Sequence, residues 1–231
     1  MKTRPILRPG HTLAITLFTL LLGTIGVAQP SSYPRMAPVE QYQMPRDAEV
    51  AMARTAAPES ISRDAEILVM GRTGYEVAVK GTNGFVCMVQ RGFAAGIQDP
   101  VFWNPKIRGP VCLNPEAVRS FLPHITKKAE WVLAGLSKEQ IQERIKAAWS
   151  NGEFPAFGPG AMSYMMSKQG VLNDQGGNWH PHLMFFTAAT EDASWGANLP
   201  GSPVLAATAA SEGFTIFMVT VSKWSDGTPA T

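Results

Sequence analysis

The stretch from residue 66 to residue 90 constrains the fold of this chain more than any other. It holds three short apolar segments separated by glycine-containing turns at 71–74 and 81–84. Asn83 and Gly84 favour a tight turn because both residue types tolerate positive φ. Residues 75–80 alternate between apolar and polar or small side chains, which is typical of a strand with one buried face. The pattern predicts three strands joined by two turns.

Three helices are expected, two of them in succession. An apolar stripe at helical spacing runs through residues 114–133, where Asn114 can cap the N-terminus and Pro123 should kink or split the helix. A second helix is predicted over 137–150, where Ser137 and Gln140 form a capping box. The two-residue link between them favours an antiparallel helical hairpin. A third, shorter helix is predicted over 45–57, which begins with a proline and is followed by Pro58.

The remaining segments supply further strands and long loops. Strands are predicted over 161–166, 182–187 and 213–224, the last of them apolar on both faces. Residues 91–111 are expected to be a loop, and its aromatic and proline content predicts that it is held against the core. We therefore expect an α+β fold with an antiparallel sheet, a helical hairpin packed on one face and one disulfide.

The N-terminus has the pattern of a secretory signal peptide. Three cations precede an uncharged, mainly apolar run at 12–27, and small residues at 26 and 28 fit a cleavage site. The alternative is an uncleaved anchor, but the run is short for a membrane span and no positive cluster follows it. We expect a signal peptide at 1–28, a flexible leader at 29–44, and a single domain at 45–231. The location is then the periplasm or the extracellular space, without a stable membrane span.

Removal of the signal changes the charge balance. The mature chain has 203 residues, with 17 Lys and Arg against 18 Asp and Glu. A nearly neutral chain lacks the basic surface of a nucleic-acid-binding protein, so nucleic acid is not an expected partner.

Two cysteines remain, Cys87 and Cys112. In an exported chain an even cysteine count predicts a disulfide. The alternative, a thiol nucleophile paired with a histidine, lacks a recognisable motif around either residue.

The stretch 176–187 is the best candidate for a site, because it combines two histidines, a tryptophan and an apolar strand. The candidate binding residues are Asn178, Trp179, His180 and His182. His180 and His182 are also the candidate ligands if a metal is present, since two histidines two apart on a strand share a face. The simpler interpretation is that His182 is a buried structural histidine at a strand start and His180 lies in a turn. We expect no metal and no cofactor.

Other residues have two interpretations each. The methionines near the expected sheet can bind copper(I), but adaptable core filling is the preferred interpretation; they are Met162, Met165, Met166 and Met184. The spacing of Tyr164 and Lys168 matches a dehydrogenase motif without the glycine-rich turn that such an enzyme needs. Tryptophans in loops either stack on a ligand or fill the core from outside.

Several motifs resemble those of a group of uncharacterised exported bacterial proteins. They are Ala56-Ala57-Pro58, Asn83-Gly84-Phe85-x-Cys87, the later Cys112, and Tyr164-Met165-x-Ser167 leading to the Pro-His-Leu-Met-Phe segment at 181–185. The resemblance covers most of the mature chain and brings no activity. It implies that the two cysteines and the 181–185 segment belong to one structural unit.

Two functions are therefore considered. The first is an exported binding or interaction protein whose partner is a small molecule or an envelope protein, bound near Trp179, His180 and His182. The second is a hydrolase, dependent on a serine or a metal, that uses His180 or His182 as its base.

Overall fold

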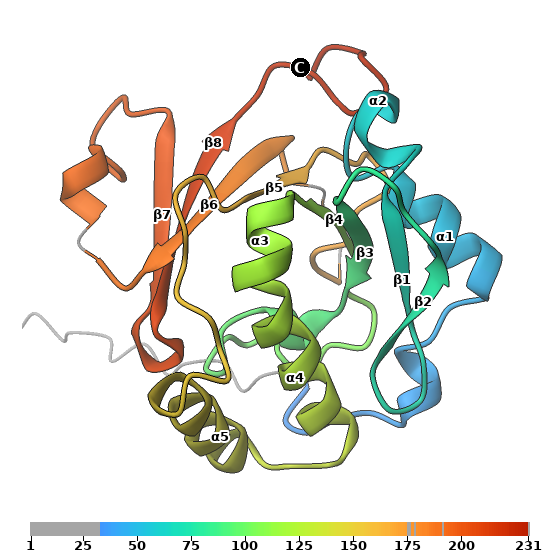
Figure 1. Ribbon diagram of the computed structural model, residues 1–231, viewed down its shortest axis with the longest axis vertical. Coiled ribbons are helices and arrows are strands. Elements are labelled where there is room, and N and C mark those ends of the chain that lie inside the picture. The colour runs from blue at the N-terminus through green and yellow to red at the C-terminus, as the bar shows by residue number, and fades with distance from the viewer. Residues whose placement is uncertain (1–32, 175–176, 178, 191, 231) are drawn as a thin grey trace, which may run out of the picture. The chain divides into compact units, whose positions relative to one another are not determined.

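An eight-stranded sheet organises the chain, with strands in the order β2-β1-β3-β4-β5-β6-β8-β7 and β2 and β7 at its two edges (Figure 1). Neighbouring strands are antiparallel except β1 and β3, which are parallel because β2 turns back on the outer side of β1. The predicted α+β class is confirmed, and the one parallel pair makes the sheet mixed. The strands are β1 Glu66–Met70, β2 Tyr75–Val79, β3 Val86–Gln90, β4 Gly109–Leu113, β5 Met162–Met165, β6 His182–Ala188, β7 Val204–Ala209 and β8 Phe214–Thr220.

The computed structural model describes residues 33–174, 177, 179–190 and 192–230. Residues 31–231 form one compact unit. The predicted signal peptide at 1–28 lies outside the described residues. Within the described residues, no helix combines the length and the apolar character needed to cross a membrane.

The helices begin and end close to the predicted positions. The Asn114 side chain accepts a hydrogen bond from the Ala117 N–H, and Ser137 and Gln140 form the capping box. The helix predicted over 114–133 is split near Pro123, which has no N–H to donate to the preceding turn. The helices are α1 Arg46–Arg54, α2 Glu59–Ser62, α3 Pro115–Ser120, α4 Leu122–Leu133 and α5 Lys138–Ser150; short 3₁₀ turns are η1 Val39–Gln41, η2 Gly92–Ala94, η3 Asp192–Trp195 and η4 Ala210–Glu212.

Helices cover both faces of the middle strands. On one face α3 and α4 pack through Phe121 and Ile125 against Met88 and Val111, and Figure 1 shows both helices crossing in front of the sheet. On the other face the small residues of α1 pack against alternate positions of β1, β3 and β4. Because both faces are covered, nearly every residue of these three strands is buried.

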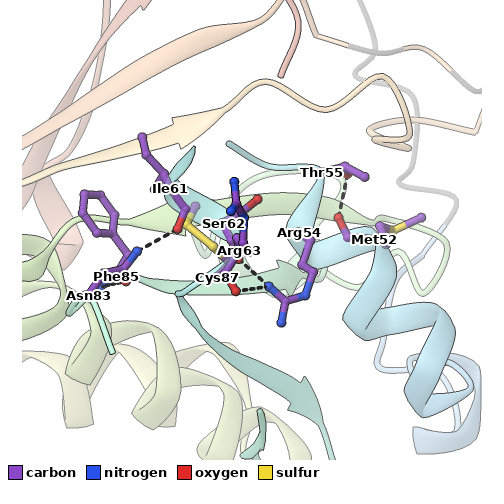
Figure 2. The surroundings of a disulfide bond; sticks show 10 residues. Met52, Arg54, Thr55, Ile61, Ser62, Arg63, Asn83, Phe85 and Cys87 are labelled. Atoms are coloured by element: carbon purple, nitrogen blue, oxygen red, sulfur yellow. Dashed lines mark hydrogen bonds between the residues drawn. A yellow bond between two sulfur atoms is a disulfide. The ribbon is translucent and has the colours of Figure 1, made fainter. Parts of the chain in front are cut away.

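The predicted disulfide is confirmed. Cys87 on β3 and Cys112 on β4 occupy directly paired positions, with a Cα–Cα distance of 3.9 Å, and both are fully buried beneath α1. The turn between α1 and α2 is fastened nearby, where Arg54 Nη1 donates to the carbonyl oxygens of Ser62 and Arg63 (Figure 2).

Two boundaries differ from the predictions. Part of the predicted flexible leader, residues 33–44, packs on the domain: Tyr42 is fully buried and its hydroxyl donates to the Trp103 carbonyl at 2.8 Å. The predicted loop 91–111 ends early, because β4 begins at Gly109. The first difference arises because Tyr42 makes contacts with distant segments, and the second because Gly109 and Pro110 pair with Gln90 and Val89 of β3.

Strand β7 was not predicted, because alanine supplies half of its residues and gives no β-strand pattern. Its outer edge is covered by the amide of Asn198, which accepts from the Ala206 N–H at 3.0 Å and donates to the Ala206 carbonyl at 3.1 Å. This side chain takes the place of a neighbouring strand and protects the edge from pairing with another chain.

We predict that replacing both cysteines with alanine lowers the free energy of unfolding by about 3–4 kcal/mol, because the bridge closes a loop between residues 25 apart. Urea unfolding of both proteins measures the loss. Reductant should destabilise the wild type to the same extent and leave the double variant unchanged. Equal stability of the two oxidised proteins would contradict the prediction.

Candidate functional site

The loop from residue 91 to residue 107 is held against the sheet at its start by a buried arginine. Arg91 Nη2 lies 2.8 Å from Glu49 Oε1, its Nε donates to the Tyr42 carbonyl at 2.6 Å, and its Nη1 donates to the Val89 carbonyl. Glu49 Oε1 also accepts from the Met70 N–H at 3.0 Å. Both charged side chains are almost completely buried, so this loop position and α1 are joined by a pair that is costly to break.

A second buried ion pair holds the middle of the loop. Lys128 Nζ on α4 lies 2.6 Å from Glu212 Oε2 in η4 and donates to the Ala95 carbonyl at 2.9 Å. Glu212 Oε1 accepts from the Ile97 N–H at 3.0 Å. His124 Nε2 lies 3.2 Å from Glu212 Oε2, so the imidazole also faces this carboxylate. One carboxylate thus joins the loop, α4 and the turn before β8.

The environment of Glu212 keeps its carboxylate ionised. Burial by itself would raise the pKa of this carboxyl, but His124 and the ammonium of Lys128 outweigh it and lower the pKa to about 2. Burial lowers the pKa of Lys128 and of His124, against the pull of the same carboxylate. The Glu212 carboxylate is therefore ionised over the neutral pH range and remains available to Lys128 and to the Ile97 N–H.

A cavity of about 220 Å³ lies between this loop and the sheet, on the face that carries α3 and α4. The volume is below the usual range for drug-sized ligands, about 300–1,000 Å³, and above the cavity of about 150 Å³ that accepts benzene. Its loop wall includes Ala94, Ala95, Val101 and Ile107. Its sheet wall consists of Gln90, Gly109, Met165, His182, Met184, Ile216 and Met218, and Trp179 and Leu172 also line it.

His182 is the titratable side chain in the sheet wall of this cavity, at the first position of β6. It is 3% exposed, and its Nδ1 lies 2.7 Å from the His180 carbonyl oxygen. A carbonyl can only accept, so Nδ1 carries the proton and Nε2 holds the lone pair. Burial lowers the pKa of His182, and the ring is neutral at pH 7. Nε2 makes no hydrogen bond within the described part of the chain.

The other predicted site residues are divided between the cavity and its surroundings. Trp179 lines the cavity, its ring centroid is 5.8 Å from that of His182, and half of its surface is exposed. His180 is exposed, does not line the cavity, and stacks against Trp224 at 6.5 Å. Asn178 lies outside the described residues. The two histidines do not lie on one strand, because β6 begins only at His182 and His180 precedes it.

The described residues offer little to the hydrolase hypothesis. No serine lines the cavity, and in the described ranges His182 has no hydrogen bond to a serine or a carboxylate. Over the same ranges, no group of three or more His, Cys, Asp or Glu side chains is placed to hold a metal ion. The serine- or metal-dependent hydrolase stays a prediction without a structural observation in its favour.

Aromatic side chains singled out in the sequence have packing roles elsewhere. Trp103 is 7% exposed within the core, and Trp195 stacks on Phe217 at 4.2 Å on the sheet face opposite the cavity. Two larger hollows, of about 420 and 450 Å³, adjoin the turn between α4 and α5 and are lined by a mixture of apolar and charged residues from that turn, from α5 and, in the first, from residues 34–36. Neither contains a buried titratable side chain, so the cavity at His182 is the better candidate.

Sequence reasoning missed most of the cavity. Met218 and Ile216 on β8 and the 91–107 loop were not connected with 176–187, because both segments are distant from it in the chain and only the folded structure brings them together. One signal was available: the apolar character of the loop predicted that it is held against the core, although not against which strands.

No protein-family model matches the chain, and neither a curated protein nor a solved structure matches it. The resemblance drawn from the motifs therefore gains no support from these comparisons.

We predict that Lys128→Met lowers the free energy of unfolding by about 3–5 kcal/mol, because it leaves the Glu212 carboxylate buried without its partner. Adding Glu212→Gln should recover part of the loss, since a neutral amide still accepts from the Ile97 N–H. Lys146→Met is the matched control, because Lys146 pairs with Glu143 on the exposed surface. Strictly additive single and double effects in urea unfolding would contradict the coupling.

Stability should also fall when the pH is lowered from 7.5 towards 5. Burial lowers the pKa of both His124 and His182 in the folded state. In the unfolded chain the histidine pKa is about 6.5, so at acidic pH the unfolded state binds protons that the folded state does not bind. The free energy of unfolding then falls by up to about 1.4 kcal/mol per pH unit for each such proton. Urea unfolding across this range measures the slope, which should be shallower in His182→Gln.

Proposed function

We propose that this chain is an exported binding protein that holds a small ligand in the cavity between β5, β6, β8 and the 91–107 loop. The observation that carries the proposal is the state of His182. A neutral imidazole lines an apolar cavity, its Nδ1 is satisfied by the His180 carbonyl, and Nε2 is left with a lone pair. Such a lone pair in apolar surroundings is satisfied by a ligand that donates to it.

The shape of the cavity supports a ligand about the size of one aromatic ring. Its walls are mostly apolar, which favours burial of carbon surface, and Trp179 adds a half-exposed aromatic ring. The two buried ion pairs support binding in another way. They hold the loop wall in position before a ligand arrives, which reduces the entropy lost on binding.

Export is part of the same proposal. It is supported by the signal-like N-terminus and by the Cys87–Cys112 disulfide, since disulfides persist mainly in oxidising compartments. The absence of free cysteines in this chain also fits such a compartment.

Phenol and toluene are suitable probes, because both fit the cavity and only phenol donates a hydrogen bond. Phenol is expected to bind more tightly than toluene by about three- to tenfold, the equivalent of a net hydrogen bond of about 0.5–1.5 kcal/mol. Titration calorimetry and ligand-induced shifts of Tm measure both affinities.

Two matched variants locate the binding. His182→Phe keeps an aromatic ring but has no acceptor, so the preference for phenol should disappear while toluene still binds. His180→Phe lies outside the cavity and should bind both probes as the wild type does. If the wild type binds neither probe, or if His182→Phe retains the preference for phenol, the proposal fails.

A further inference from the structure

Four side chains with soft donor atoms meet on the sheet wall of the cavity. His182 and Met184 are two residues apart on β6 and face the same side, and both line the cavity. Met165 on β5 is paired directly with His182, and Met218 on β8 is paired directly with Met184. Three strands thus bring three thioethers and one imidazole to a single patch.

The spacing of these positions allows the four side chains to converge. Directly paired residues of antiparallel strands have Cβ atoms about 4.5–5.5 Å apart, and residues two apart on a strand are separated by about 6.6–6.8 Å. Methionine has three rotatable side-chain bonds and adapts its sulfur position readily. The Met165 side chain extends over Gly109 of the neighbouring strand β4, where a Cβ would lie only 2.9 Å from Met165 Cε, so glycine is needed there to accommodate it.

We propose that this patch binds a single copper(I) ion through His182 Nε2 and the sulfur atoms of Met165, Met184 and Met218. The inference rests on the proposed function, because it uses the same cavity and the same lone pair of His182 Nε2, here as the donor to a metal ion. Thioether sulfur selects soft copper(I) over zinc, magnesium or calcium, and imidazole is a compatible fourth donor. Methionine here has a role beyond core filling.

The imidazole is oriented as a metal ligand requires. Histidines that bind metals usually donate their second ring N–H to a carbonyl or carboxylate, which fixes the tautomer and raises the basicity of the ligating nitrogen. His182 does this through Nδ1 and the His180 carbonyl, at 2.7 Å. His180 thus contributes to the site through its backbone carbonyl, which orients the His182 ring.

The charged groups of the cavity leave the patch available to a monovalent cation. The Arg91 guanidinium is neutralised by Glu49 and donates to two carbonyl groups, and it belongs to the opposite wall. Asp99 also lies on the loop wall, where its Oδ1 accepts from the Val101 N–H at 2.9 Å. The two cysteines are joined in the disulfide, so the chain has no thiolate to compete for the ion.

The test is a copper(I) titration of the purified, oxidised chain in ascorbate, with bathocuproine disulfonate as the competing chelator. One equivalent is expected to bind. Met165→Leu, Met184→Leu and Met218→Leu should each weaken binding by at least about tenfold, since even the loss of an outer-shell partner costs about 10–100-fold. Zinc(II) should not bind at this patch. X-ray absorption of the loaded protein should show sulfur and nitrogen scatterers together.

Met162→Leu is the matched control. Met162 is on β5 with Met165 but pairs with Phe185 on the opposite face and does not line the cavity, so its substitution should leave copper(I) affinity unchanged. Each leucine variant should still bind phenol, which shows that the cavity remains intact. Loss of copper(I) with retention of phenol supports the inference.

Two outcomes would overturn it. If the wild type binds phenol but no copper(I), the inference fails and the proposed function stands. If copper(I) binds equally well to the triple leucine variant, the ion is held elsewhere and the inference also fails. Failure of both phenol and copper(I) binding would remove the proposed function as well.

Discussion

The carboxylate of Glu212 connects three separate parts of this structure. Through Lys128 it fastens η4 to α4, and through the Ile97 N–H and the Ala95 carbonyl the same pair fastens the 91–107 loop. Buried charges of this kind are expensive to desolvate and are stable only when each has its partners in place. The loop wall of the cavity, the last turn before β8 and the position of α4 therefore depend on one ion pair, which the Arg91–Glu49 pair supplements at the start of the loop.

A rigid loop opposite a sheet leaves a space that the side chains do not fill. On the loop side the space is bounded mainly by small and aliphatic residues, and on the sheet side by methionines and one histidine. The sheet wall carries the chemistry, because strand geometry sets the direction of each side chain, and the paired residues Met165–His182 and Met184–Met218 face the same way. The charged residues of the loop wall, Arg91 and Asp99, make contacts that hold the loop in position.

Most of the local structure could be predicted, and most of the site could not. The helix start at Asn114, the split near Pro123, the capping box at Ser137 and the tight turn at Asn83-Gly84 each depend on a few neighbouring residues. Strand β7 and the packing of residues 33–44 were missed, because the alanines of β7 and the polar leader have no strong local preference. Of the candidate site residues, Trp179 and His182 line the cavity, and His180 does not.

The sequence by itself determined where helices, turns and most strands form, and it indicated that the two cysteines form a bridge. These features follow from side-chain periodicity, capping and cysteine parity, which are properties of short segments or of composition. Only the tertiary structure decided which segments face each other. It placed the 91–107 loop over β5, β6 and β8 and separated His182 from His180. It also brought Met218 beside Met184, because strand order and buried ion pairs join residues that are distant in the chain.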